Sequence, residues 1–284
     1  MLSDFSKTFP EPMNTDIKRS VESIRERTSI QPRIAIILGS GLGAFAENLK
    51  KKTKIPANRI PGLPVSTVAG HQGVLVFGEW DKIPLVTLQG RTHYYEGYPL
   101  EKVTYVVRLF AALGIRLLIV TNAAGGVNPD FQAGDLMLIT DQINQMFRNP
   151  LRGPLKYGGE RFPDMSQPYS LKYFDLVQEI AREKSISLKR GVLYVSTGPC
   201  YETAAEVRMI RKFGADAASM STVPEVIVAR QMGLEVIGIS CITNLATGLS
   251  RKPLNHKEVT ETANLVQMKF LELIAGIITH LGKY

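Results

Sequence analysis

The sequence predicts an α/β protein, built on a mixed and largely parallel β-sheet that is surrounded by helices. Three observations indicate this fold class. Short runs rich in β-branched residues recur along the chain, and segments with helical periodicity separate several of them. The composition is that of an ordinary globular protein, with 44% apolar and 21% charged residues. That composition excludes disordered, collagen-like and coiled-coil chains.

A single domain is expected over residues 1–284. At about 150 residues per domain, this length allows one large α/β domain or two smaller ones. However, no internal repeat, low-complexity tract or long Gly/Ser/Pro linker marks a boundary. Residues 1–32 are expected to be a helical lead-in, because apolar residues from Ile17 to Ile24 lie at helical spacing and Pro32 follows as a stop.

Strands and helices are expected to alternate along the rest of the chain. Strands are expected at residues 33–39, 73–80, 83–89, 115–123, 135–143, 191–198 and 234–244, and helices at residues 100–113, 202–213 and 256–279. In sheets of this class the ligand-binding loops follow the carboxyl ends of the strands. The residues directly after each strand are therefore the candidates for function.

The net charge is +8, from 34 basic and 26 acidic residues, which suits a nucleic acid or a small anionic substrate. Most of this charge is dispersed. Its densest run, Lys50, Lys51, Lys52 and Lys54, has no interleaved aromatic residues. We interpret the run as a solvated turn rather than a nucleic-acid patch, and a nucleic-acid-binding module stays a competing hypothesis.

The expected location is the cytoplasm. The first residues carry acids and prolines where a signal peptide would have a basic end and an apolar block. No run of about 18 apolar residues occurs, so a membrane span is not expected either. Cys200 and Cys241 are too few for a disulfide framework and lack metal-ligand spacing. A reducing compartment is therefore favoured, and a structural zinc site is not expected.

The first predicted strand runs into the glycine-rich segment Gly39–Ala44. Glycines let successive backbone N–H groups turn toward an anion, and Ser40 adds a hydroxyl donor, so a phosphate loop is predicted. The segment also matches the G-x-G-x-x-A fingerprint of nicotinamide-dinucleotide dehydrogenases, which needs an acidic residue about 20 positions later. Residues 58–62 supply none. An orthophosphate loop is favoured over a dinucleotide loop, with a plain tight turn as the remaining alternative.

The segment Gln89–Pro99 concentrates a cation, an imidazole and phenols in a turn framed by Gly and Pro. Arg91 offers a planar fork of donors suited to phosphate oxygens, and His93 can donate a further hydrogen bond or change protonation near neutrality. Tyr95 could stack on a ligand, hydrogen-bond to it, or simply pack. We interpret the segment as part of a site. His71 is ambiguous between loop packing and a position near the same anion.

Later strand ends carry further candidates for binding an anion. Asn122 and the backbone N–H of Ala123 follow an apolar strand and precede small residues that let backbone approach a ligand. A compact turn needed only for packing is the alternative. Ser221 stands before a helix that begins with Pro224, where an N-cap is the default role and an anion contact the more specific one.

Three more polar residues could contact a ligand away from the anion. Glu202 lies near a predicted helix start, where it could cap the helix or accept a hydrogen bond from a ligand N–H. Asn244 ends the last predicted strand, and we interpret it as functional because an unpaired amide has no role in a core. His256 begins the final helix and, taken alone, is typical of a surface or capping residue.

Nine segments taken in order resemble the trimeric purine nucleoside phosphorylase family over roughly residues 15–280. They are ILGSGLG, GHQG, QGRTHYYEGYP, TNAAGGVN, RFPDMS, GPCYET, GADAASMSTVPEVIVAR, ITNLATGLS and NHKEV. The resemblance implies a single-domain phosphorylase with a barrel-like mixed sheet, assembled as a homotrimer. It also implies a reaction without metal or organic cofactor, in which inorganic phosphate is a co-substrate.

The resemblance also implies roles for the matched positions. It makes Asn244, Glu202 and His93 catalytic. It implies phosphate binding by Ser40, His71, Arg91, His93, Asn122, Ala123 and Ser221, purine binding by Tyr201, Glu202, Ala218 and Asn244, and ribose binding by Tyr95, Met220 and His256.

The implied reaction is phosphorolysis of inosine, guanosine and their deoxy forms. These 6-oxopurines present N1–H to an acceptor and O6 to a donor, which suits Glu202 beside the Asn244 amide. Adenosine would set the N1 lone pair against a carboxylate. A xanthosine-accepting phosphorylase is the alternative within the family. His256 suits a 5′-hydroxyl, whereas methylthioadenosine phosphorylases carry an apolar residue there.

The chain departs from the family pattern in one loop. The family places an aromatic residue from a neighbouring subunit shortly before RFP. Here Tyr157 stands one residue further away, with Gly158 and Gly159 between. The departure puts in question a role for Tyr157 as a lid that crosses between subunits.

Overall fold

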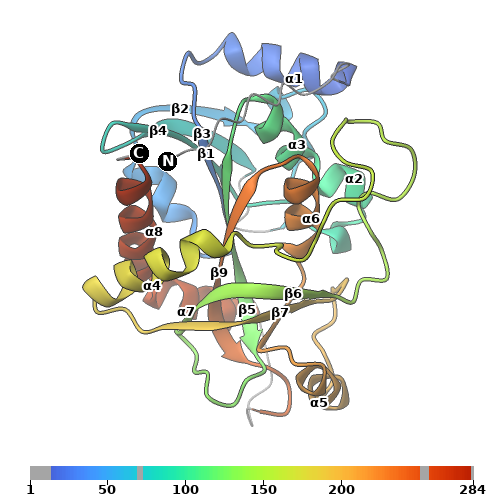
Figure 1. Ribbon diagram of the computed structural model, residues 1–284, viewed down its shortest axis with the longest axis vertical. Helices are drawn as coiled ribbons and strands as arrows, with labels where there is room; N and C mark the ends of the chain where they lie inside the picture. The colour runs from blue at the N-terminus through green and yellow to red at the C-terminus, as the bar shows by residue number, and fades with distance from the viewer. Residues whose placement is uncertain (1–13, 69–72, 250–255, 283–284) are drawn as a thin grey trace.

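A computed structural model describes residues 14–68, 73–249 and 256–282, without the side chains of residues 256–260. Within this part of the chain, nine strands form one sheet with helices packed around it (Figure 1). The strands are β1 (Ile34–Leu38), β2 (Lys50–Pro56), β3 (Val74–Trp80), β4 (Ile83–Gln89), β5 (Leu117–Gly126), β6 (Leu136–Asn144), β7 (Leu188–Val195), β8 (Ala217–Ser219) and β9 (Glu235–Leu245). The α-helices are α1 (Thr15–Arg25), α2 (Leu100–Val103), α3 (Tyr105–Ala112), α4 (Phe174–Glu183), α5 (Ala204–Lys212), α6 (Val223–Gln231), α7 (His256–Leu265) and α8 (Gln267–Leu281).

The sheet closes on itself over part of its width. Its strand order is β2-β3-β4-β1-β5-β8-β7-β6-β9, and β9 also pairs with β5. Strands β5, β8, β7, β6 and β9 therefore form a closed, barrel-like ring, and the other four extend from β5. Parallel and antiparallel pairs are mixed, since β4, β1, β5 and β9 run parallel, while β2–β3, β3–β4, β5–β8 and β6–β9 are antiparallel. The predicted fold class is confirmed.

The parallel set brings distant segments of the chain to one edge of the sheet. Leu38 at the end of β1 lies opposite Gln89 at the end of β4, and Asn122 and Gly125 of β5 lie opposite Ser240 and Asn244 of β9. The loops that follow these strands must therefore open on the same side. This arrangement is what places the candidate site.

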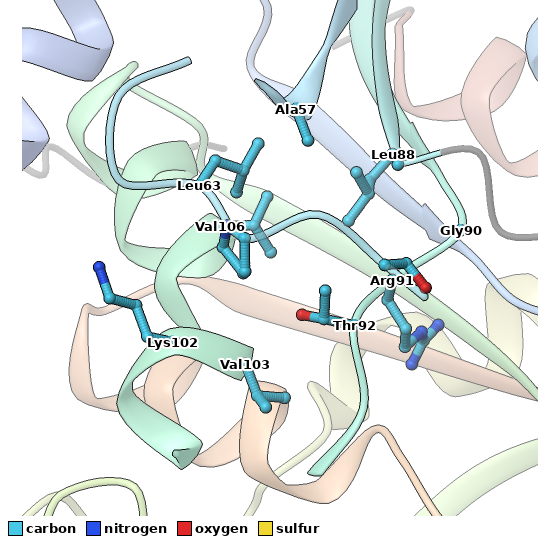
Figure 2. Close-up of a pocket in the computed structure, with 12 residues that line it drawn as sticks. Ala57, Leu63, Leu88, Gly90, Arg91, Thr92, Lys102, Val103 and Val106 are labelled. Atoms are coloured by element: carbon cyan, nitrogen blue, oxygen red, sulfur yellow. The ribbon is translucent and has the colours of Figure 1, made fainter. Parts of the chain in front are cut away.

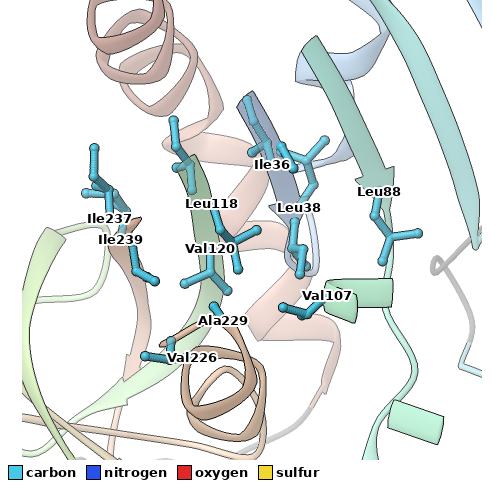
Figure 3. Close-up of a cluster of buried hydrophobic side chains, with 14 of the residues drawn as sticks. Ile36, Leu38, Leu88, Val107, Leu118, Val120, Val226, Ala229, Ile237 and Ile239 are labelled. Atoms are coloured by element: carbon cyan, nitrogen blue, oxygen red, sulfur yellow. The ribbon is translucent and has the colours of Figure 1, made fainter. Parts of the chain in front are cut away.

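The core lies between the central strands and the helices that cover them. Strands β1, β5 and β9 read as nearly continuous apolar runs because both faces of this part of the sheet are covered. Helix α6 is buried almost all round, and its side chains lie under β5 and β9 (Figure 3). The buried cluster around this contact also includes residues of β1 and α3, and its labelled members include Ile36, Leu38, Val107, Leu118, Val120, Val226, Ala229, Ile237 and Ile239.

The lysine-rich run is a strand, and the prediction of a solvated turn was wrong. Residues Lys50–Pro56 pair antiparallel with β3 at the edge of the sheet, with Ile55 turned into the core and the lysines mostly exposed. Lysines on an edge strand hinder pairing with another chain. Lys51 also forms an ion pair with Glu79, and Lys54 one with Glu47. These carboxylates weaken the case for a nucleic-acid patch.

Other differences concern short or interrupted elements. The three-residue β8 and helix α4 were not predicted. The predicted helix over 256–279 is two helices, with Val266 between them. The predicted helix over 100–113 is also divided, at Thr104, whose hydroxyl donates to the Leu100 carbonyl at 2.7 Å and so competes with the backbone ladder. Of the helices in the described residues, none combines the length and the apolar character that crossing a bilayer requires.

Candidate active site

One cavity of about 370 Å³ opens at the carboxyl ends of the parallel strands, a volume within the usual range for a small-molecule site. It brings together most of the predicted site residues, although they come from segments far apart in the sequence. These residues are Ser40, Arg91, His93, Tyr95, Asn122, Ala123, Tyr201, Glu202, Ala218, Met220, Ser221 and Asn244.

Two predicted residues cannot be located in this cavity. His71 lies outside the described residues, and so does the side chain of His256, whose backbone begins α7. Conversely, Val68 and Ser219 line the cavity but were not singled out from the sequence. A valine in a loop and a serine at the end of the three-residue strand β8 carry no local signal of function, so only the folded chain identifies them.

A second, much smaller void lies beside the loop that carries Arg91. It measures about 10 Å³ and is lined mainly by aliphatic side chains such as Leu63, Val103 and Val106 (Figure 2). A void of this size holds about one water molecule. It is therefore not a second substrate site.

The glycine-rich segment after β1 is not a dinucleotide-binding unit. It leads into a short 3₁₀-helix, Gly43–Asn48, and then into the antiparallel edge strand β2, whereas the fingerprint requires a βαβ unit with a parallel second strand. Gly39 is needed here because a Cβ would lie 2.8 Å from the Asn122 Cα. This close approach brings the segment that carries Ser40 beside Asn122, in the middle of β5. The hypothesis of a dehydrogenase was wrong.

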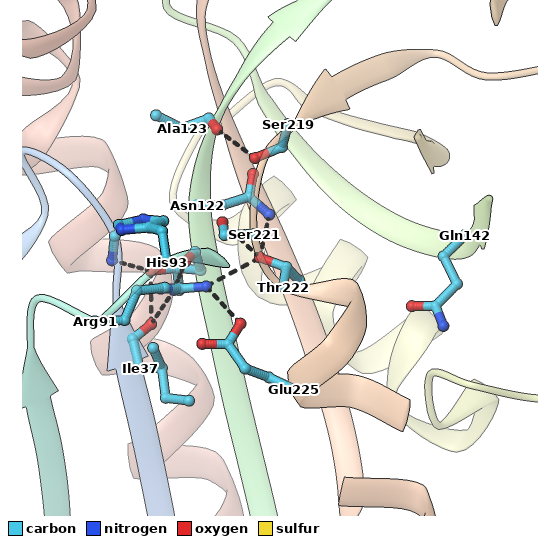
Figure 4. A network of polar contacts seen from close by, with 12 residues as sticks. Ile37, Arg91, His93, Asn122, Ala123, Gln142, Ser219, Ser221, Thr222 and Glu225 are labelled. Atoms are coloured by element: carbon cyan, nitrogen blue, oxygen red, sulfur yellow. Dashed lines mark hydrogen bonds and ion pairs between the residues drawn. The ribbon is translucent and has the colours of Figure 1, made fainter. Parts of the chain in front are cut away.

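Arg91 is buried and held by the protein through both terminal nitrogens (Figure 4). Nη1 donates to Glu225 Oε2 at 2.8 Å and to Thr222 Oγ1 at 3.1 Å, and Nη2 donates to the carbonyls of Ile37 and Thr121. Burial lowers the pKa of Arg91 and raises the pKa of Glu225, although each partner opposes the shift of the other. A guanidinium stays protonated in proteins, so Arg91 places a buried positive charge beside the cavity, and Glu225 is its ion-pair partner.

His93 is oriented by a carboxylate three residues later. Its Nδ1 lies 3.0 Å from Glu96 Oε1, and its backbone N–H donates to the same oxygen at 2.6 Å. Burial acts to raise the pKa of Glu96, but hydrogen bonds from Thr67 and His93 outweigh it and the pKa is lowered. The ionised carboxylate therefore accepts from Nδ1–H, which leaves Nε2 on the opposite side of the ring.

Tyr95 packs against His93, with ring centroids 4.7 Å apart and an interplanar angle of 11°. Burial, and then the charge of Glu96, raise the pKa of Tyr95 to about 12. The phenol is therefore neutral at physiological pH. A neutral phenol in the cavity wall can both donate and accept a hydrogen bond.

Ser221 is not the N-cap of α6, as its default interpretation predicted. The N-cap is Thr222, and Ser221 precedes it and lines the cavity. The N-terminus of α6 thus begins directly beside the groups of Arg91 and Asn122. Backbone N–H groups at a helix N-terminus favour a bound anion.

Glu202 is not a capping residue either. Thr203 caps α5 in a reciprocal capping box with Glu206, so the Glu202 side chain has no such task. Instead, Ser196 donates to Glu202 Oε1 at 3.0 Å. Glu202 and Tyr201 line the cavity, and 40% of Tyr201 is exposed, so its ring stands at the open side.

Asn244 lines the same cavity, and its amide is not unpaired, as the sequence interpretation assumed. Thr243 Oγ1 donates to Asn244 Oδ1 at 3.0 Å, and Asn244 Nδ2 donates to the Leu245 carbonyl at 3.1 Å. The two bonds set which end of the amide is the donor. Gly125 leaves room for it, since a Cβ there would lie 3.3 Å from Nδ2.

Tyr157 is engaged within its own chain. Its hydroxyl donates to Glu101 Oε1 at 2.8 Å, and the guanidinium of Arg108 lies 4.7 Å from its ring centroid. Burial and the bond to Glu101 raise the pKa of Tyr157, so the hydroxyl remains a donor. Tyr157 borders a separate small cavity of about 60 Å³ rather than the large one.

Comparison with known proteins identifies close relatives. A family model described as the phosphorylase superfamily matches residues 33–279, a range that contains all nine described strands. The chain is 50% identical over 270 residues to purine nucleoside phosphorylase 1 of Geobacillus stearothermophilus, which covers 95% of this chain and 98% of that protein. It is 44% identical over 270 residues to the purine nucleoside phosphorylase of Rattus norvegicus, covering 92% and 93% of the two chains.

Solved structures agree with these relatives. A Schistosoma purine nucleoside phosphorylase in complex with hypoxanthine superposes with a TM-score of 0.89 at 36% identity, covering 95% of this chain and 99% of the other. The Schistosoma mansoni enzyme in complex with inosine gives a TM-score of 0.85 at 37% identity, covering 92% and 95%. The similarity in fold and sequence thus extends over nearly the whole chain.

Proposed function

We propose that this chain, a member of the phosphorylase superfamily, acts on 6-oxopurine nucleosides such as inosine and guanosine. Its sequence similarity to purine nucleoside phosphorylases over most of the chain identifies it as an enzyme of that kind. Phosphate cleaves the nucleosides reversibly to the free base and ribose 1-phosphate or its deoxy form. The observation that carries this proposal is the single cavity that joins anion-binding loops to the Glu202 and Asn244 side chains.

The phosphate end of the cavity is formed by Ser40, Arg91, His93, Asn122, Ser221 and the N–H of Ala123. The supporting geometry is the buried cation of Arg91 together with the N-terminus of α6, which begins directly after Ser221 and Thr222. A dianion held there is both the nucleophile and a negative charge beside the sugar. Holding it in place makes attack on C1′ nearly unimolecular, and no protein nucleophile is needed.

The sugar lies between the phosphate and the base, against Tyr95 and Met220, with His256 proposed at the 5′-hydroxyl. In the reaction, the C1′–N9 bond breaks and its electron pair passes to the purine, while a phosphate oxygen forms the new bond to C1′. The sugar gains positive charge as in glycoside hydrolysis. Bound phosphate stabilises that charge. The proton of HPO₄²⁻ passes to the departing purine, so neutral base and the ribose 1-phosphate dianion are formed, and the reaction balances with phosphate as the co-substrate and without a metal or organic cofactor.

The base lies against Tyr201 and Ala218, with Glu202 accepting from N1–H and Asn244 facing N7. Ser196 occupies one oxygen of Glu202, which supports an orientation in which the other oxygen meets the base. The carboxylate suits 6-oxopurines and opposes the N1 lone pair of adenosine. A mismatch of this kind can make kcat/KM for one nucleoside about 10⁴ times that for the other.

Phosphate dependence tests the reaction. Inosine mixed with the enzyme should release hypoxanthine only when phosphate is added, with ribose 1-phosphate formed in equal amount. Release of hypoxanthine at the same rate in phosphate-free buffer would identify a hydrolase and contradict the proposal. Parallel assays with guanosine, xanthosine and adenosine would define the accepted bases.

Glu202→Gln tests the basis of substrate choice. An amide can donate to the adenine N1, so the ratio of kcat/KM for inosine over adenosine is expected to fall at least about tenfold. Glu206→Gln is the matched control, because Glu206 is an exposed carboxylate in the capping box of the next helix and Gln also serves there. An unchanged ratio in Glu202→Gln would remove Glu202 from purine recognition.

We further propose a cytoplasmic homotrimer that acts in purine salvage. Two free thiols, Cys200 and Cys241, support a reducing compartment. Large apolar side chains stand exposed between residues 147 and 162, including Phe147 at 78% and Phe162 at 87%, which supports contact with another copy. Sedimentation would test the assembly against a mass of three 31.4 kDa chains.

A further inference from the structure

The backbone of Thr222 adopts a conformation that β-branched residues avoid. Its φ is 79° and its ψ is −57°, and the Val223 N–H donates to the Ser221 carbonyl at 3.0 Å, which closes a γ-turn of the rare, strained hand. A non-glycine residue in this conformation is strained, whereas Gly would adopt the same φ without strain. A side chain kept at this position must therefore contribute something that Gly cannot.

Thr222 stands apart from the other strained positions of the described residues. Five other non-glycine residues have positive φ, and all five are exposed: Lys51, Asp81, Lys82, Phe147 and Ser185. Thr222 is fully buried and is the β-branched member of the set. A strained backbone conformation persists only where the surrounding structure holds it in place, and in a buried residue such as Thr222 the packed neighbours can do so.

The Thr222 hydroxyl is where two proposed phosphate-binding side chains meet (Figure 4). Its Oγ1 accepts from Arg91 Nη1 at 3.1 Å and from Asn122 Nδ2 at 2.9 Å, and it lies 3.4 Å from Ser221 Oγ. Thr222 makes no side-chain hydrogen bond to the helix it caps. The hydroxyl therefore serves the side chains beside the cavity rather than the helix.

We propose that Thr222 is a positioning residue for phosphate. It does not line the large cavity itself, whereas Arg91, Asn122 and Ser221 do. The strained turn directs Ser221 into the cavity one residue before the N-cap of α6, and the Thr222 hydroxyl holds Arg91 and Asn122 in register with it. Donors held in place before binding lose little freedom when the anion arrives. The inference rests on the proposed phosphorolysis.

Thr222→Val and Thr222→Ser test this role. Valine keeps the shape but leaves two buried donors without an acceptor, so the KM for phosphate is expected to rise about tenfold or more at saturating inosine. The KM for inosine at saturating phosphate should stay within about twofold. Serine keeps the hydroxyl and is expected to restore the phosphate KM to within about twofold of the parent value.

Thr87→Val is the matched control. Thr87 is a buried residue of β4 whose hydroxyl has no hydrogen-bond partner in the part of the chain that the structure describes. The same chemical change there should leave both KM values unaltered. Because valine at position 222 could prevent folding, Thr222→Gly provides a second test. Glycine removes the strain together with the hydroxyl, so a folded protein with a raised phosphate KM is expected.

The outcomes separate the inference from the proposed function. If the parent enzyme shows no phosphate-dependent cleavage of inosine, the proposed function fails. If the parent enzyme is active, the inference is overturned when folded Thr222→Val or folded Thr222→Gly has the same KM for phosphate as the parent. An equal rise in both KM values, or a Thr222→Ser variant as impaired as Thr222→Val, would overturn it too, because a merely structural role predicts those results.

Discussion

Asn244→Ala is expected to lower kcat for inosine by about 10²–10³, the loss typical of removing one donor from a developing negative charge. As the C1′–N9 bond breaks, electron density accumulates at N7 of the purine. The Asn244 amide carries two N–H groups, and the Leu245 carbonyl accepts from one of them. The second is expected to donate to N7, with most effect in the transition state, so kcat should fall more than KM changes.

Two further variants test whether the loss of kcat is specific to the Asn244 amide. Asn244→Asp keeps the acceptor for Thr243 but sets a carboxylate against N7, so a loss at least as large is expected. Asn48→Ala removes an exposed amide that donates to the Ala44 carbonyl at 3.0 Å, and its kcat should equal that of the parent. Steady-state kinetics with inosine, alongside thermal melts, would measure all three. A kcat within about threefold of the parent in folded Asn244→Ala would refute the leaving-group role.

The second large effect is on stability. Glu225→Leu is expected to lower the free energy of unfolding by about 3–5 kcal/mol, because it leaves the buried charge of Arg91 without its partner. Both side chains are almost inaccessible, at 2% and 1% exposure, and Nη1 lies 2.8 Å from Oε2. Urea unfolding at one fixed protein concentration would measure the change, since assembly also contributes to stability.

A surface ion pair gives the matched comparison. Glu79→Gln breaks the contact with Lys51 at 3.0 Å, where the lysine is 74% exposed, and should cost about 0–1 kcal/mol. The double variant Arg91→Met with Glu225→Leu should recover much of the lost stability while phosphate binding stays impaired, because no charge is then left buried. A Glu225→Leu variant as stable as the parent would show that the pair does not hold this part of the fold.

Much of the fold could be predicted because it is encoded locally. Apolar runs such as residues 117–120 are visible as strands, and the mixed sheet follows from their alternation with helices. The local sequence failed to indicate a strand where lysines are frequent, as in Lys50–Pro56, and where the strand is very short, as in Ala217–Ser219. There the pairing partner decides the conformation, and it lies elsewhere in the chain.

Local patterns of residues show which chemical groups stand at the ends of the parallel strands. Because these strands share one direction, their ends meet at one edge of the sheet. Arg91, Asn122 and Asn244, which lie in or directly after such strands, could therefore be predicted from the sequence. Tertiary structure alone decided what each group can do there. Arg91 meets Glu225 across 134 positions of sequence, and Thr222 keeps a strained backbone because two distant donors converge on its hydroxyl. Such contacts depend on packing between elements, which no local pattern of residues records.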